Sequence, residues 1–121
     1  MRVLVAEDEA LIGLMLEDEL RHRGHGAVLA WTAEAALRHA RAGRFDLALV
    51  DIGLPDMDGI ELVRRLRAAD PGMPVVVCTG YAAGDAGLRG LPGGVTVLQK
   101  PCSALDLLRA VEAVLPRGRD P

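Results

Sequence analysis

The sequence has little lysine, few aromatic residues and few cysteines. Its 121 residues include three aromatic rings and two cysteines, and Lys100 is the single lysine among fourteen basic residues. No apolar run approaches the roughly 20 residues of a membrane span, and the acidic run at 7–9 follows the start too soon for a signal peptide. The net charge of −3, with no basic block and few rings to stack on bases, argues against nucleic-acid binding. We therefore expect a cytoplasmic protein that binds neither nucleic acid nor membrane.

The two cysteines, Cys78 and Cys102, are far apart and lack the Cys-x-x-Cys or Cys/His spacing of a metal site. We expect two reduced thiols, with Cys78 a buried strand residue. The length suits one compact domain, which we assign to residues 1–116, followed by a short tail at 117–121.

Short β-rich segments alternate with longer helical segments five times along the chain. The segments at 3–6, 47–50 and 75–78 are continuously apolar, which is typical of parallel strands covered on both faces. Alternating β and α units of this length predict an α/β fold, with an open, doubly wound parallel sheet and helices on both faces. The expected strand order is 2-1-3-4-5. The five predicted strands are residues 3–6, 27–30, 47–50, 75–78 and 95–98.

Capping residues and apolar periodicity locate the helices. The first is predicted at 9–23, Thr32 is the predicted N-cap of the second, and Ser103 is that of the last, with Asp106 at its third position. The segment 80–94 holds six of the fourteen glycines and predicts a short, weak fourth helix. We expect one apolar stripe of Leu11, Ile12, Met15, Leu16 and Leu20 on the first helix, a core face of Leu62, Val63 and Leu66 on the third, and solvent-exposed positions for Arg64, Arg65, Arg67, His22, His25 and His39.

Polar residues follow the predicted strands at the carboxyl edge, where sheets of this kind bind ligands. Each residue alone has an ordinary explanation, such as an acid in the first turn of a helix or a solvated loop side chain. Because the carboxyl ends of parallel strands meet at one edge, their coincidence favours a common site. They are Glu7 and Asp8 after the first strand, Asp51 after the third, Thr79 after the fourth and Lys100 after the fifth.

Asp8 and Asp51 follow neighbouring strands, and carboxylates brought together repel each other unless a cation lies between them. Two carboxylates, the Gly53 carbonyl and water are oxygen ligands that suit Mg²⁺, whereas no histidine or cysteine stands nearby for zinc or copper. With the Thr79 hydroxyl and the Lys100 ammonium, the site suits a phosphoryl group, and Asp51 is the candidate nucleophile that forms an aspartyl phosphate. No glycine-rich phosphate loop is present, so we expect no bound nucleotide.

The chain resembles the receiver domain of two-component response regulators over essentially its whole length. The resemblance rests on Val-Leu-Val-Ala-Glu-Asp-Glu at 3–9, Asp-Leu-Ala-Leu-Val-Asp-Ile-Gly-Leu-Pro-Asp-Met-Asp-Gly at 46–59, Val-Val-Val-Cys-Thr-Gly-Tyr at 75–81 and Gln-Lys-Pro at 99–101. It implies a flavodoxin-like (βα)5 fold. It also implies that Asp51 is the phosphoacceptor, that Asp8 and the Gly53 carbonyl bind Mg²⁺ with Glu7 acting through water, that Thr79 and Lys100 contact the phosphoryl group, and that the peptide bond between Lys100 and Pro101 is cis.

The resemblance also implies the partners. The phosphodonor is then a sensor histidine kinase or a histidine phosphotransfer protein. The weak local structure predicted at 80–94 favours the fourth helix, fifth strand and fifth helix as the surface that binds a downstream protein. The chain itself is expected as a monomer or a phosphorylation-dependent homodimer. Many receivers have an aromatic residue three positions before the lysine, where this chain has Val97. Tyr81 either takes over that gating role or is a partly exposed loop residue, and the pattern is similar to that of stand-alone receivers without the usual aromatic.

Three functions are compatible with these residues. The first is a stand-alone phosphorylation switch that is no enzyme beyond its own phosphorylation and dephosphorylation. The second is a receiver module of a longer response regulator or hybrid histidine kinase. The third is a Mg²⁺-dependent phosphohydrolase, which is disfavoured because such enzymes use a second acid two residues after the nucleophile, where this chain has Gly53, and because we expect no cap domain.

Overall fold

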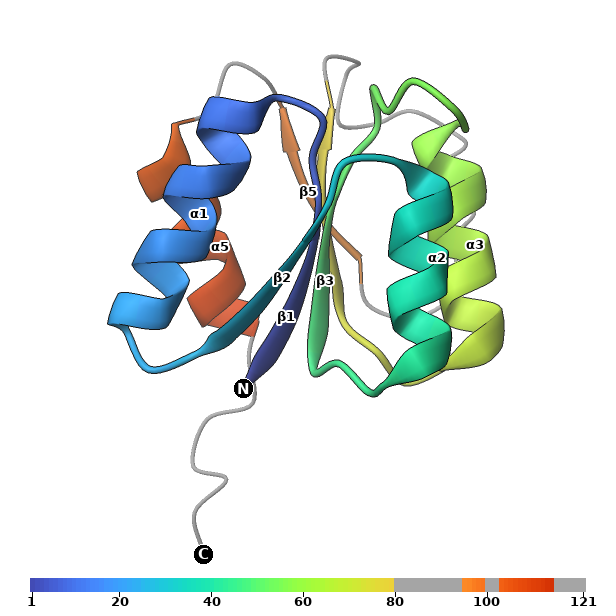
Figure 1. Cartoon of the computed structure of the whole chain (residues 1–121), viewed down its shortest axis with the longest axis horizontal. Helices are drawn as coiled ribbons and strands as arrows, with labels where there is room; N and C mark the ends of the chain where they lie inside the picture. Colours follow the sequence, from blue (N-terminus) through green and yellow to red (C-terminus); the bar gives the residue numbers. More distant parts are fainter. Residues whose placement is uncertain (80–94, 100–102, 115–121) are drawn as a thin grey trace, which may run out of the picture.

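The computed structural model describes residues 1–79, 95–99 and 103–114. Five parallel strands form one sheet in the order β2-β1-β3-β4-β5, so the predicted fold class is confirmed. Helices α1 and α5 cover one face of the sheet, and α2 and α3 cover the other (Figure 1). The strands are β1 (Arg2–Ala6), β2 (Gly26–Ala30), β3 (Leu47–Asp51), β4 (Val75–Thr79) and β5 (Val95–Gln99), and the helices are α1 (Ala10–His22), α2 (Ala33–Ala42), α3 (Gly59–Ala69) and α5 (Ala104–Val114).

Several predicted features lie outside the described residues, namely the fourth helix at 80–94, Cys102 and the tail at 117–121. Within the described part of the chain, no helix has the length and apolar character needed to cross a membrane.

The central strands are buried on both faces because their side chains alternate between two apolar clusters. Val3 and Val5 of β1 pack with α1 and α5, whereas Leu4 and Ala6 pack with α2 and α3. Cys78 of β4 is a buried strand residue, as predicted. The continuous apolar runs in the sequence therefore correspond to strands enclosed between two helical layers.

The predicted apolar stripe of α1 is wrong in part. Leu16 and Leu20 are fully buried against the sheet, with Ile12 partly buried in line with them, but Leu11 is 72% exposed and Met15 is 49% exposed. Positions four residues apart lie on one narrow line of a helix, and the line through Ile12, Leu16 and Leu20 faces the sheet whereas Leu11 and Met15 lie on a line that faces away from it. At Gly13, next to Ile12, the Trp31 ring packs so closely on α1 that a Cβ would lie 3.1 Å from it.

Two further surface predictions are wrong. Arg67 of α3 is only 5% exposed, and its burial lowers the pKa of the guanidinium while the nearby Asp70 carboxylate opposes that shift. His25, just after α1, has a side chain that is 18% exposed because it packs towards α5. Arg64, Arg65, His22 and His39 are exposed, as predicted.

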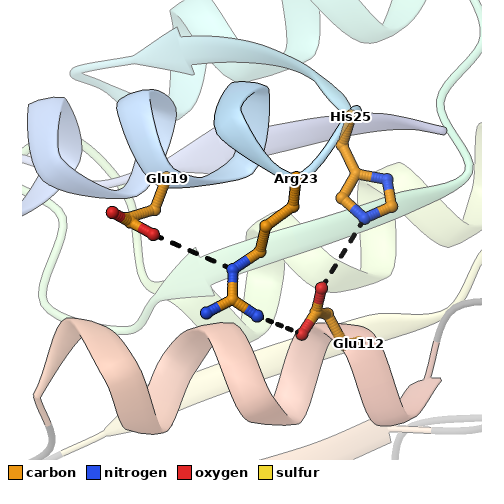
Figure 2. A network of polar contacts seen from close by, with 4 residues as sticks. All are labelled: Glu19, Arg23, His25 and Glu112. Atoms are coloured by element: carbon orange, nitrogen blue, oxygen red, sulfur yellow. Dashed lines mark hydrogen bonds and ion pairs between the residues drawn. The ribbon is translucent and has the colours of Figure 1, made fainter.

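A polar network joins the end of α1 to α5 (Figure 2). Arg23 donates a hydrogen bond to Glu112 of α5 and lies 3.8 Å from Glu19 of its own helix, measured from Nε to Oε1. The second Glu112 oxygen is 3.9 Å from His25 Nε2. The network therefore links α1 to α5, the two helices that cover the same face of the sheet.

Candidate functional site

Strand register gathers the polar residues at the carboxyl edge of the sheet. Ala6 of β1 lies opposite Val50 of β3, so the residues that come next on the two strands are neighbours. One carboxylate oxygen from each of Glu7, Asp8 and Asp51 lies within 4.8 Å of the others. We call these three residues the carboxylate cluster.

The burial of the carboxylate cluster makes it suited to a cation. Asp51 is 3% exposed and Glu7 is 6% exposed, whereas Asp8 reaches the surface. Buried carboxylates held this close repel one another, and a cation among them offsets that repulsion. The donors are all hard oxygen atoms, so the residues present fit Mg²⁺ and do not fit zinc.

Backbone groups orient two of the carboxylates. The Gly53 amide donates to Asp51 Oδ1 at 3.0 Å, and the Glu9 amide donates to Glu7 Oε2 at 3.0 Å. A Cβ at Gly53 would stand 3.6 Å from Asp51 Oδ1, so glycine keeps that side of the carboxylate open. The Glu7 amide in turn donates to Ala30 of β2 at 3.0 Å.

Thr79 is the last residue of β4 and is fully buried next to the end of β3. Val97 of β5 is partly buried against the cluster that includes α2 and α3. The remaining predicted site residues, Lys100, Tyr81 and the Lys100 to Pro101 peptide bond, lie outside the described residues.

Asp56, in the loop between β3 and α3, is a contact that the sequence analysis missed. Its Oδ1 accepts from the Ala33 amide at 2.8 Å and its Oδ2 from the Glu34 amide at 3.1 Å, at the start of α2. These two backbone hydrogen bonds, the one from Ala33 first, lower the pKa of the Asp56 carboxyl. Thr32 caps the same helix as predicted, accepting from the Ala35 amide at 3.1 Å.

Gly59, the first residue of α3, was also missed. A Cβ there would lie 2.5 Å from the Cα of Ile52, the residue directly after Asp51. The Gly59 amide donates to the Ile52 carbonyl at 3.3 Å. The start of α3 therefore packs directly on the backbone of the chain segment that carries the candidate nucleophile.

The model of the response regulator receiver domain family matches residues 3–112. The chain belongs to this family. It is a receiver domain of the kind found in two-component response regulators, with the fold and the acidic edge described above.

Relatives of this receiver include longer proteins. The probable transcriptional regulatory protein TcrX of Mycobacterium tuberculosis is 34% identical over 116 residues, which are 95% of this chain and 50% of TcrX. The receiver spans about half the length of the curated relatives it matches.

Solved structures resemble this receiver over nearly its whole length. A CheY-like response regulator receiver domain protein from Methanospirillum hungatei has a TM-score of 0.82 and 33% identity, covering 93% of this chain and 90% of that chain. The response regulator protein TrrA from Thermotoga maritima, solved in complex with Mg²⁺-BeF, has a TM-score of 0.75 and 26% identity, covering 94% of this chain and 98% of that chain.

Proposed function

We propose that this receiver is a cytoplasmic phosphorylation switch in which Asp51 accepts a phosphoryl group from a phosphohistidine in the presence of Mg²⁺. The observation that carries the proposal is the carboxylate cluster, in which the buried Asp51 lies close enough to Asp8 and Glu7 for one cation to lie among them. TrrA, a relative in fold and sequence, was solved with Mg²⁺-BeF, which supports the same ion here.

In the proposed reaction, an Asp51 carboxylate oxygen forms a bond to phosphorus as the N–P bond of the donor breaks. The electron pair of the broken bond returns to the imidazole nitrogen, which takes a proton from solvent. The Gly53 amide holds the Asp51 carboxylate in place, and the Thr79 hydroxyl and Lys100 are the proposed partners of the phosphoryl oxygens. Mg²⁺ held by Asp8, Asp51 and the Gly53 carbonyl, with Glu7 acting through water, would neutralise negative charge on those oxygens and on the carboxylates.

Acetyl phosphate with Mg²⁺, followed by intact mass measurement, tests this proposal. We expect a single phosphoryl adduct that is stable in acid and labile in base, and that is lost in Asp51→Asn or after chelation. Asp18→Asn, a change at an exposed aspartate of α1 outside the cluster, is the matched control and retains the adduct. An adduct that persists in Asp51→Asn contradicts the assignment, and sustained phosphate release from a small ester favours a phosphohydrolase instead.

Lys100 is the only lysine in a chain with thirteen arginines, and we propose that its compact ammonium contacts the phosphoryl group. The forked guanidinium of arginine has a different shape and donor geometry. Lys100→Arg is therefore expected to keep the charge and the fold, measured by circular dichroism, and to impair the switch. Partner activation equal to that of the wild-type receiver would remove this role.

The exposed apolar residues of α1 mark a candidate surface for the phosphodonor. Leu11, Leu14 and Met15 are 72%, 51% and 49% exposed on the helix that directly follows Glu7 and Asp8. A protein that brings its phosphohistidine to Asp51 must cover the surroundings of the carboxylate cluster, and we propose that it packs on these side chains. Leu14→Glu should slow transfer from a phosphorylated histidine kinase domain while leaving phosphorylation by acetyl phosphate unchanged. Equal effects on both donors would contradict the surface.

The output is proposed to be a partner protein that binds at the fourth helix, β5 and α5, with the receiver a monomer or a homodimer formed on phosphorylation. A receiver module within a longer regulator is the second candidate. It is favoured by TcrX, a probable transcriptional regulatory protein twice as long as the matched region. The mass of the native protein separates the two candidates.

A further inference from the structure

The loop at 52–58 joins the candidate nucleophile to α3 and carries Gly53, whose carbonyl is a proposed Mg²⁺ ligand. Its start is fixed because the Gly53 amide donates to Asp51 Oδ1 at 3.0 Å. Its end is fixed because the Gly59 amide donates to the Ile52 carbonyl at 3.3 Å. Both ends of the loop are therefore held by hydrogen bonds. The position of its middle, residues 54–58, which we call the tip, depends on other contacts.

Asp56 holds the tip, and it does so by contacts with α2 rather than with its own helix. The first amides of a helix have no partner within the helix. In α2 those of Ala33 and Glu34 donate to the two Asp56 carboxylate oxygens at 2.8 and 3.1 Å, and the next donates to Thr32. A residue more than 20 positions away along the chain therefore satisfies two of the three amides, with its negative charge at the positive end of the helix dipole.

We propose that Asp56 is a positioning residue, which ties the tip of the Mg²⁺-binding loop to the start of α2 and so restrains the peptide after Gly53, whose carbonyl is the proposed Mg²⁺ ligand. This inference rests on the proposed function, because it concerns the affinity of the same carboxylate cluster for Mg²⁺. Asp56 is not a member of the carboxylate cluster, and its two oxygens accept from the α2 amides. Side chains that act on a metal through its ligands commonly change affinity by about tenfold to a hundredfold when removed.

The test compares two variants that each weaken the cap of α2. Asp56→Ala removes the two hydrogen bonds that reach the loop, whereas Thr32→Ala removes a cap on the same helix without touching the loop. We expect Asp56→Ala to weaken binding of MgCl2 by about tenfold, measured by titration of ¹H–¹⁵N amide signals without any phosphodonor. Thr32→Ala should stay within twofold of the wild-type receiver, and Asp56→Asn, which keeps one acceptor oxygen, should fall between. Equal losses in Asp56→Ala and Thr32→Ala, or no loss in either, overturn the inference.

The metal-free protein separates this inference from the proposed function. There, Asp56→Ala should shift the Gly53 amide signal and speed its hydrogen exchange, while Thr32→Ala leaves Gly53 unchanged. If the wild-type receiver fails to bind MgCl2 but Gly53 responds to Asp56→Ala, the proposed function fails and the link between loop and α2 stands. If MgCl2 binds but the Gly53 amide signal and its hydrogen exchange are unchanged in Asp56→Ala, the link between loop and α2 is overturned and the proposed function stands.

Discussion

Replacing Gly59 with alanine should destabilise the receiver because the added methyl group would clash with the backbone of Ile52. The added Cβ would lie 2.5 Å from Ile52 Cα, 2.8 Å from Ile52 Cδ1 and 3.2 Å from the Ile52 carbonyl carbon. The Ile52 side chain can rotate away, but its Cα can move only with the end of β3. Overpacking of this kind costs about 1–3 kcal/mol, and the better helix propensity of alanine offsets at most about 1 kcal/mol. Because the close contact is with a backbone atom, we expect the upper end of that range, and so a net loss of about 2 kcal/mol in the free energy of unfolding.

Urea denaturation followed by circular dichroism measures this loss. With a denaturant slope of about 2 kcal/mol per M, the midpoint should fall by about 1 M. Gly72→Ala is the matched control, because nothing lies within 4 Å of a Cβ at that turn position, and it should change stability by less than about 0.5 kcal/mol. A Gly59→Ala midpoint equal to that of Gly72→Ala would refute the reasoning.

Three other measurements address packing and charge. A double-mutant cycle on Arg23 and Glu112 should give a coupling of about 0.2–1 kcal/mol that shrinks in high salt, and zero coupling at low salt contradicts the network. Leu16→Ala should cost about 2–5 kcal/mol, whereas Leu11→Ala, at an exposed position of the same helix, should cost less than about 0.5 kcal/mol. The Ser103 amide donates to the Asp106 carboxylate. This hydrogen bond, and to a smaller extent one with the Ser103 hydroxyl, lowers the pKa of Asp106 below its usual 3.8. The contribution of Asp106 to the free energy of unfolding should therefore be complete above the unfolded-state pKa of 3.8, and should disappear as the pH falls through the lower pKa of the folded state. The destabilisation caused by Asp106→Ala must then shrink between pH 6 and pH 2.

The fold and the meeting of the acidic residues could be predicted because both follow from local patterns. Continuous apolar runs marked β1, β3 and β4, and the strand order then set which strand ends are neighbours. Each strand is one residue longer than predicted. In β3 and β4 the extra residues are Asp51 and Thr79, which are polar, so a search for apolar runs ends before them.

The features that escaped prediction depend on partners far away in the sequence. Nothing around Asp56 indicates that its carboxylate binds amides more than 20 residues earlier, because that contact exists only once α2 and α3 lie side by side. Arg67 was predicted to be exposed because it is charged, and Leu11 was predicted to be buried because it fits the apolar periodicity of the first helix. Their actual exposure depends on how far the sheet and the neighbouring loops extend over each helix. Gly59 was part of a recognised motif, but only the coordinates show that a backbone occupies the space of its missing side chain.

Trp31 gives this receiver an internal optical probe. It is the only tryptophan in the chain, it is 41% exposed, and its ring packs over Gly13 of α1. It also directly precedes Thr32 and lies two residues before Ala33, the first of the two α2 residues whose amides donate to Asp56. The loop at 52–58 is thereby connected, through Asp56, Ala33 and Thr32, to an indole whose emission depends on its contact with solvent. We therefore expect stopped-flow fluorescence of the unlabelled protein to report the proposed Mg²⁺ binding and phosphorylation in real time, from a position outside the proposed reacting groups.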